Sequence, residues 1–153
     1  MEGSNPVARA NVAPVVDPPA TPSLHAFSFV RPNAGLNHPT FVVAGAGELR
    51  DGLLEPERIV RRGEISADAL LEKAAYVLEV MEKRLAGLGA EWQEVTTANV
   101  YTAHALDAGL RDLVLNRIGP AARRGLFWHV ARPPVVEIEF EMDVRGVACE
   151  LNE

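Results

Sequence analysis

Apolar and charged side chains alternate along Val136-Glu137-Ile138-Glu139-Phe140-Glu141-Met142-Asp143-Val144-Arg145. Successive side chains of a β-strand point to opposite faces of the sheet. The stretch therefore places its apolar residues on one face and its charged residues on the other. This pattern predicts a strand over residues 135–147 with one core face and one carboxylate-rich face.

Two amphipathic helices are predicted to cover the apolar face. Residues 66–88 carry apolar side chains at three- and four-residue steps, with Ser66 as the N-cap and Gly89 as the stop. A second helix begins after Asp107, another good N-cap residue, and ends at Gly119-Pro120. We expect both helices to pack on the same face of the sheet.

Four further segments have the composition of strands, so the predicted order is β-β-α-β-α-β-β. These segments are residues 25–30, 41–45, 95–102 and 126–130. The order predicts an α+β fold with a mixed sheet and two helices on one face. Two helices cannot cover both faces, so we expect the opposite face to meet solvent or another subunit.

The length of 153 residues is that of one domain, preceded by a proline-rich segment. Five prolines fall within the first 22 residues, and a proline cannot join a helix interior or a central strand. We therefore expect residues 1–22 to form an extended N-terminal arm and residues 23–153 to form a single domain. Packing of the arm across a neighbouring subunit is the alternative.

Charge and cysteine content narrow the class of protein. Fifteen basic against 21 acidic side chains give a net charge of −6, which opposes binding to a phosphate backbone. The lone Cys149 cannot form an internal disulfide, as is typical of a reducing compartment. No apolar run approaches the ~20 residues of a membrane-spanning helix, and the start lacks a secretory signal pattern. We expect a soluble cytoplasmic protein that binds neither nucleic acid nor membrane.

The motifs of common metal and nucleotide sites are absent from the sequence. The four histidines are scattered, and none belongs to a recognisable ligand motif. Gly45-Ala46-Gly47 supplies the first two glycines of a dinucleotide fingerprint, but Arg50 stands where the third is needed. We therefore expect no metal and no cofactor.

An arginine–carboxylate pair is the strongest candidate for chemistry. Arg123 and Arg124 precede one predicted strand, and Glu137 lies at the start of the next. In a shared pocket the guanidinium would grip a substrate carboxylate while the glutamate orients a water. In a simple hairpin the two ends lie apart, so their meeting depends on strand register or on a neighbouring subunit. A surface ion pair, or no pair, is the alternative.

The order of these elements resembles the Rid family (RidA/YjgF, also labelled endoribonuclease L-PSP). The resemblance covers about residues 25–147, nearly everything but the arm. The residues that carry it are Phe41-Val42-Val43-Ala44-Gly45, Leu85-Ala86-Gly87-Leu88-Gly89-Ala90, Val95-Thr96-Thr97-Ala98-Asn99-Val100-Tyr101, Pro120-Ala121-Ala122-Arg123-Arg124 and Val136-Glu137-Ile138-Glu139. We interpret the chain as a divergent member of this family.

The resemblance implies a chorismate-mutase-like α+β subunit that forms a homotrimer with sites between subunits. Family members with activity hydrolyse reactive 2-imino or enamine acids to keto acids and ammonia without metal or cofactor, and some relatives deaminate 2-aminomuconate. By position, Arg124 or Arg123 would hold the substrate carboxylate and Glu137 would place the attacking water. The backbone of Ala44 and Gly45 would line the pocket.

A departure from the family pattern bears on the substrate. Ala44-Gly45-Ala46 stands where the family often has Ser-Gly-Gln, which removes a hydroxyl and an amide. Trp128 shares a strand face with Arg124, so it is predicted to form an apolar wall of the cleft or to pack in an interface. We expect His129 to face the helices as a hydrogen-bonded core residue, with proton transfer as the alternative.

The leading hypothesis is a deaminase of a carboxylate-bearing imine or enamine, such as a 2-imino acid or a 2-aminomuconate-type substrate. A non-catalytic trimeric protein that binds a small carboxylate is the alternative. Ribonuclease activity is a weaker alternative, suggested only by the older family label and opposed by the acidic charge balance.

Overall fold

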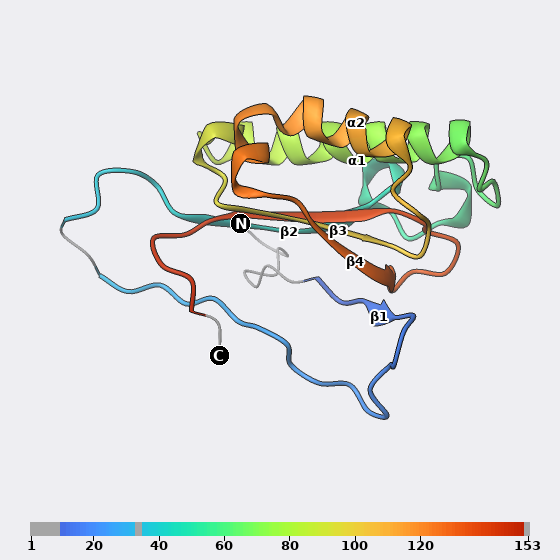
Figure 1. The fold of residues 1–153 in the computed structure, drawn as a ribbon, viewed down its shortest axis with the longest axis horizontal. Helices are drawn as coiled ribbons and strands as arrows, with labels where there is room; N and C mark the ends of the chain where they lie inside the picture. The colour runs from blue at the N-terminus through green and yellow to red at the C-terminus, as the bar shows by residue number, and fades with distance from the viewer. Residues whose placement is uncertain (1–9, 33–34, 152–153) are drawn as a thin grey trace.

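A computed structural model describes residues 10–32 and 35–151, and its centre is a five-stranded mixed sheet (Figure 1). The strand order is β1-β4-β3-β5-β2. The pair β3–β4 is parallel, whereas β1–β4, β3–β5 and β2–β5 are antiparallel. The strands are β1 (Ala13–Pro14), β2 (Phe41–Gly47), β3 (Thr97–Thr102), β4 (Phe127–Arg132) and β5 (Glu141–Gly146).

Two helices, α1 (Ala67–Gly87) and α2 (Ala108–Ile118), lie side by side on one face of the sheet (Figure 1). Both helices begin directly after the N-cap residues that the sequence predicts. Ser66 Oγ accepts the Ala69 N–H at 3.3 Å, and Asp107 Oδ1 accepts the Leu110 N–H at 2.9 Å. No helix in the two described ranges has both the length and the apolar character that crossing a membrane requires.

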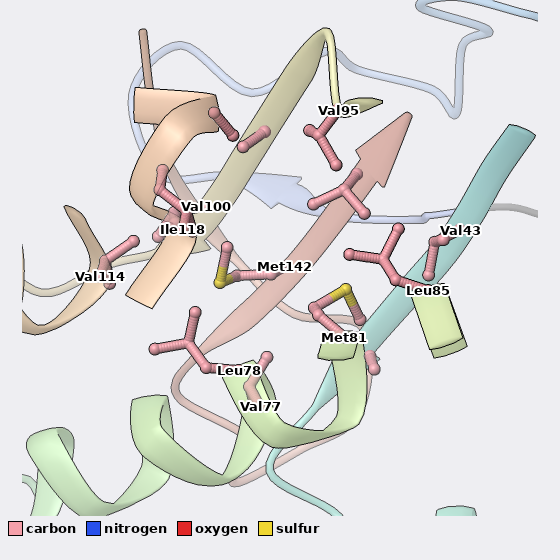
Figure 2. Close-up of a cluster of buried hydrophobic side chains, with 14 of the residues drawn as sticks. Val43, Val77, Leu78, Met81, Leu85, Val95, Val100, Val114, Ile118 and Met142 are labelled. Carbon is pink, nitrogen blue, oxygen red and sulfur yellow. The ribbon is translucent and has the colours of Figure 1, made fainter. Parts of the chain in front are cut away.

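The core lies between the helices and the sheet (Figure 2). Leu78 and Met81 of α1 and Ile118 of α2 pack toward Val100 of β3 and Met142 of β5, all of them fully buried. The apolar stripes of the helices therefore meet the apolar side of the sheet, as the sequence predicts. The α+β fold with both helices on one face is confirmed.

The strand predicted at residues 25–30 is wrong for this structure. The segment is extended but belongs to no sheet, and Phe27 is 75% exposed. Period-two alternation favours a strand, but a strand also needs a neighbouring backbone, and this segment has none among the described residues. The first strand is instead β1, which lies inside the predicted arm.

The last strand is also shorter than predicted. It begins at Glu141 rather than at residue 135, because Glu137 adopts a positive φ of 70° that breaks the extended backbone. The alternation itself persists, since Ile138 and Phe140 are buried in the core. The charged face of β5 therefore consists of Glu141, Asp143 and Arg145.

The described part of the arm lies on the side of the sheet away from the helices, next to β4 (Figure 1). Ala13 pairs with Arg132 of β4, and the Val15 N–H donates to Val130 O at 3.0 Å. This is the outer edge of β4, a position that tolerates Pro14. Residues 1–9 of the predicted arm lie outside the described residues, and the domain boundary near residue 22 stays a prediction.

Candidate active site

A polar cluster occupies the helix-free face of the sheet. Neighbouring residues of paired strands share a face, so the non-core residues of β3, β4 and β5 come together there. We call the group the sheet-face cluster. Its members are Asn99, Tyr101, His129, Glu141 and Asp143.

Asp143 is the hydrogen-bonding centre of this cluster. Its Oδ1 accepts Asn99 Nδ2 at 2.7 Å, and its Oδ2 accepts the Tyr101 hydroxyl at 2.6 Å. His129 Nε2 lies 3.0 Å from Asn99 Oδ1, and its ring stacks on that of Tyr101 with centroids 4.8 Å apart. Two donors thus hold the Asp143 side chain in one orientation within the cluster.

The backbone of Ala44 and Gly45 forms a β-bulge beside this cluster. Val43 pairs with Val144, whereas Ala46 pairs with Met142, so β2 carries one extra residue opposite Asp143. Arg84 Nη1, from α1, donates to Ala44 O at 2.8 Å and lies 3.4 Å from Gly45 O. The bulge therefore turns the carbonyl groups of Ala44 and Gly45 toward Arg84 at the edge of the sheet.

Glu141 packs directly against Gly45. A Cβ on Gly45 would overlap Glu141 Oε1, so only glycine leaves room for this carboxylate. Glu141 is 6% exposed, and burial raises the pKa of its carboxyl to about 7. The nearby charges of Asp143 and Glu48 raise the pKa further, and Arg84 opposes them. Glu141 can thus both donate and accept a proton near neutral pH.

Burial also shifts the titration of two aromatic members of the cluster. It raises the pKa of Tyr101, which Asp143 raises further by charge and by hydrogen bonding. It lowers the pKa of His129, against the opposing attraction of Asp143. Both side chains are therefore neutral at physiological pH, and Glu141 is the member poised to exchange a proton.

The predicted Arg124–Glu137 pair does not meet within one chain. Arg124 Nη1 donates to Val95 O at 2.9 Å, just before β3 begins. Glu137 Oε2 forms an ion pair with Arg62 Nη2 at 2.7 Å. Glu137 lies four residues before Glu141, which pairs with Tyr101 near the other end of β3. The two side chains therefore lie toward opposite ends of the sheet. Arg123 is exposed.

His129 has the opposite orientation to the one predicted, and Trp128 lies on the other face of β4. Trp128 pairs with the buried Val100 and so lies on the helix side, where it is 42% exposed and its Nε1 lies 3.4 Å from Thr102 O. His129 pairs with Tyr101 on the helix-free face. The expectation that His129 faces the helices is wrong because the parallel register with β3 sets the phase of β4. Proximity of Trp128 to a cleft stays a prediction.

The sequence contained a signal for the residues that the prediction missed. Glu141 and Asp143 belong to the same charged stripe as Glu137, and the alternation already placed all three on one face. Which carboxylate lies beside Gly45 depends on the bulge in β2, a non-local feature. In residues 10–32 and 35–151, no group of three or more His, Cys, Asp or Glu side chains is arranged to hold a metal ion.

Comparisons with known proteins identify relatives of this chain. A family model described as 2-aminomuconate deaminase CnbZ matches residues 1–151. A 2-amino-5-chloromuconate deaminase of Comamonas testosteroni is 41% identical over 154 residues. The alignment covers 95% of this chain and 58% of that protein, so the chain spans little more than half the length of this relative.

Solved structures resemble the chain in fold. A candidate endoribonuclease of Thermotoga maritima superposes with a TM-score of 0.52 at 22% identity, covering 75% of this chain and 84% of its own. YyfB of Yersinia pestis, from the conserved Rid family, has a TM-score of 0.49 at 17% identity and covers 71% and 78%. The first likeness shows the fold alone.

Family membership follows from the match along nearly the whole chain. The family match and the 41% identical relative confirm that the chain belongs to a deaminase family, as the resemblance to the Rid family implied, and the fold agrees with this interpretation. The chain belongs to the 2-aminomuconate deaminase family CnbZ.

Proposed function

We propose that the protein is a deaminase that hydrolyses a carboxylate-bearing enamine or imine of the 2-aminomuconate type to the keto product and ammonia. Membership of the family and the deaminase of Comamonas testosteroni support this substrate class. The single observation that carries the proposal is the Glu141 carboxylate, buried against the glycine of the β2 bulge with a pKa of about 7. Such a group is suited to acid–base work at neutral pH.

The proposed chemistry needs proton transfer and one water. A proton added to carbon converts the enamine to an iminium ion, whose carbon is electrophilic. Water then adds to the carbon of the C=N bond to give a carbinolamine. The hydroxyl proton of this intermediate moves to its nitrogen as the C–N bond breaks, which releases ammonia and leaves the C=O bond of the keto product. Glu141 would supply the first proton and then, as a carboxylate, take a proton from the attacking water. A held substrate and an oriented water suffice for such a step without a cofactor.

We infer that substrate binding involves two subunits of a homotrimer. The open sheet face and the separation of Arg124 from Glu141 within one chain support this arrangement. An exposed arginine such as Arg124 would reach the Glu141 region of a neighbour and grip the substrate carboxylate bidentately. Arg123 is the second candidate for this binding role, and the Ala44–Gly45 backbone is proposed to line the same pocket.

Two carboxylates compete for the role of proton-transfer group. Glu137 is the residue that the family resemblance indicates, but its carboxylate is bound by Arg62 and lies at the surface. Glu141 is buried beside Gly45 and shares its face with Asp143 and Tyr101. The buried position favours Glu141, because desolvation raises its proton affinity into the working range.

The decisive experiment compares the isosteric variants Glu141→Gln and Glu137→Gln. Ammonia release is measured on freshly generated 2-aminomuconate and on a 2-imino acid produced in situ by an amino-acid oxidase. We expect wild-type turnover, loss of at least about 100-fold in kcat for Glu141→Gln, and less than about twofold change for Glu137→Gln. The reverse pattern would assign the proton transfer to Glu137.

The same assay separates the alternative functions. Thermal stabilisation by the carboxylate, sensitive to Arg124→Met and without turnover, would instead indicate a binding protein. Cleavage of single-stranded RNA that is lost in Glu141→Gln would indicate a ribonuclease. Absence of ammonia release from both substrates at any pH between 5 and 9 would refute the deaminase proposal.

A further inference from the structure

A second carboxylate, Glu48, is fully buried together with Lys73 of α1. Lys73 Nζ lies 3.1 Å from Glu48 Oε1 and donates to Val60 O at 2.8 Å, and both side chains are 0% exposed. Removing two charges from water is costly, and apolar replacements of such pairs are often equally stable. Stability alone therefore does not account for this pair, and the proposed chemistry does not use it directly.

The carboxylate of Glu48 holds the backbone that leads into β5. Its Oε1 accepts the Glu139 N–H at 2.6 Å, and its Oε2 accepts the Phe140 N–H at 3.1 Å. The ladder between β2 and β5 ends at the pair Gly47–Glu141. Beyond this last strand pair, the Glu48 carboxylate accepts the hydrogen bonds of the two backbone amides that immediately precede Glu141.

The glycines of the same stretch bring β2 close to this backbone. A Cβ on Gly47 would lie 2.6 Å from Ile138 Cγ2, and one on Gly45 would overlap Glu141. Gly45, Gly47 and Glu48 therefore form one continuous contact with residues 138–141. Lys73 fixes the end of this contact by binding Glu48 from the covering helix.

We propose that the buried Glu48–Lys73 pair is a positioning device that holds the Glu141 carboxylate at Gly45 and sets its proton exchange in the deaminase site. The proposal rests on the proposed function of Glu141. Glu48 and Lys73 touch no substrate in it and act only through Glu141 and the backbone before it.

The charges around Glu141 define what Glu48 contributes. Asp143 of β5 and Glu48 disfavour its ionisation, Arg84 of α1 favours it, and Tyr101 of β3 is neutral. Removal of the Glu48 charge therefore lowers the pH at which Glu141 ionises. A merely structural pair would change stability without moving this titration.

The test uses Glu48→Gln, which keeps the size of the side chain but removes its charge. We expect the alkaline limb of the kcat/KM profile for 2-aminomuconate, above which Glu141 has lost the proton it must supply, to move to lower pH by on the order of one unit. The value of kcat should fall roughly tenfold, and KM should change less than about twofold. The titration of Glu141 itself is followed by ¹³C NMR of labelled glutamate carboxyls, assigned by difference from Glu141→Gln.

Two further variants separate positioning from folding. The double variant Glu48→Gln/Lys73→Met removes both buried charges, so it should regain thermal stability relative to Glu48→Gln. Its pH profile and kcat should remain altered. Glu82→Gln is the matched control, because it breaks an ion pair with Arg117 that Glu141 does not contact, and it should leave the profile unchanged.

The outcomes distinguish this proposal from the proposed function. Full recovery of kcat and of the profile in the double variant would show that the unpaired Lys73, and not the loss of Glu48, disturbs Glu141 in the single variant, and it would overturn the proposal. An unmoved Glu141 titration in Glu48→Gln would overturn it as well. If the wild type released no ammonia, the deaminase would be refuted, and the NMR titration would still decide whether Glu48 controls Glu141.

Discussion

Substitution of Gly45 by alanine tests the contact at the centre of the candidate site. The added Cβ would overlap Glu141 Oε1 and lie 3.1 Å from Glu141 Cδ and 3.1 Å from Ala10 Cβ. Favourable carbon–carbon contacts are about 3.5–4.0 Å, so the carboxylate has to retreat by on the order of 1 Å. Because the displaced atoms end a flexible side chain, the fold should accommodate the methyl group.

The expected cost therefore falls mainly on activity. An off-rotamer side chain costs about 0.5–1.5 kcal/mol, which lowers the melting temperature by roughly 1–6 °C in a domain of this size. A displacement of about 1 Å at a reacting group costs about 100-fold in rate. We expect Gly45→Ala to lose about 100-fold in kcat/KM for ammonia release while it remains folded.

Gly87→Ala is the matched control. A Cβ at Gly87, in the last turn of α1, meets nothing within 4 Å, so this variant should keep full activity and gain up to about 1 kcal/mol. The assay is ammonia release from 2-aminomuconate, with circular dichroism as the check on folding. Wild-type kcat/KM in a folded Gly45→Ala would refute the assignment of Glu141 to the reaction.

Three further predictions concern charge and hydrogen bonding. The pKa of Glu141 is raised to about 7 in the folded state, so the folded state binds a proton that the unfolded state has released, and the contribution of Glu141 to stability falls as pH rises from about 4.5 to 7. In Glu141→Gln the melting temperature should depend less on pH across that window. An unchanged slope of melting temperature against pH would contradict the raised pKa. Tyr101→Phe removes a 2.6 Å hydrogen bond to Asp143 and should destabilise the fold by about 1–3 kcal/mol in urea unfolding, whereas no loss would show that water replaces the hydroxyl. Arg124→Met should raise KM for a carboxylate substrate at least about tenfold with little change in kcat, and a larger effect of Arg123→Met would move the binding role to that residue.

The helices and the core strands were predictable from the sequence because their signals are local. Ser66 and Asp107 cap the two helices where expected. In each helix the apolar residues that recur at three- and four-residue steps form the buried face. The alternation of residues 138–144 gave the correct inward and outward faces of β5. Each of these features depends on residues within a few positions of one another.

The errors arose where a feature depends on a distant backbone. Residues 25–30 alternate like a strand, but a strand is defined by its neighbour, and none is paired with them in the described chain. The orientation of Trp128 and His129 follows from the parallel register of β4 on β3, which the sequence does not reveal. Sequence spacing alone could not fix either arrangement.

The candidate site was predicted in part. The Ala44–Gly45 backbone was predicted to line the pocket, and in the structure Gly45 packs against the carboxylate of Glu141. The identity of that carboxylate depends on the one-residue bulge in β2 and on the positive φ of Glu137, and neither is visible in the sequence. The catalytic role of Glu137 therefore stays a prediction, whereas Glu141 of the same charged stripe is the residue that packs against Gly45.

The pairing of Ala13–Pro14 with β4 has a consequence for assembly. The arm satisfies backbone groups on the outer edge of β4 with only two paired residues and the Val15 N–H. An incoming strand from another copy would compete for those same donors and acceptors. Any association that uses this edge must first displace the arm, so shortening the N-terminus should change how readily the subunits join.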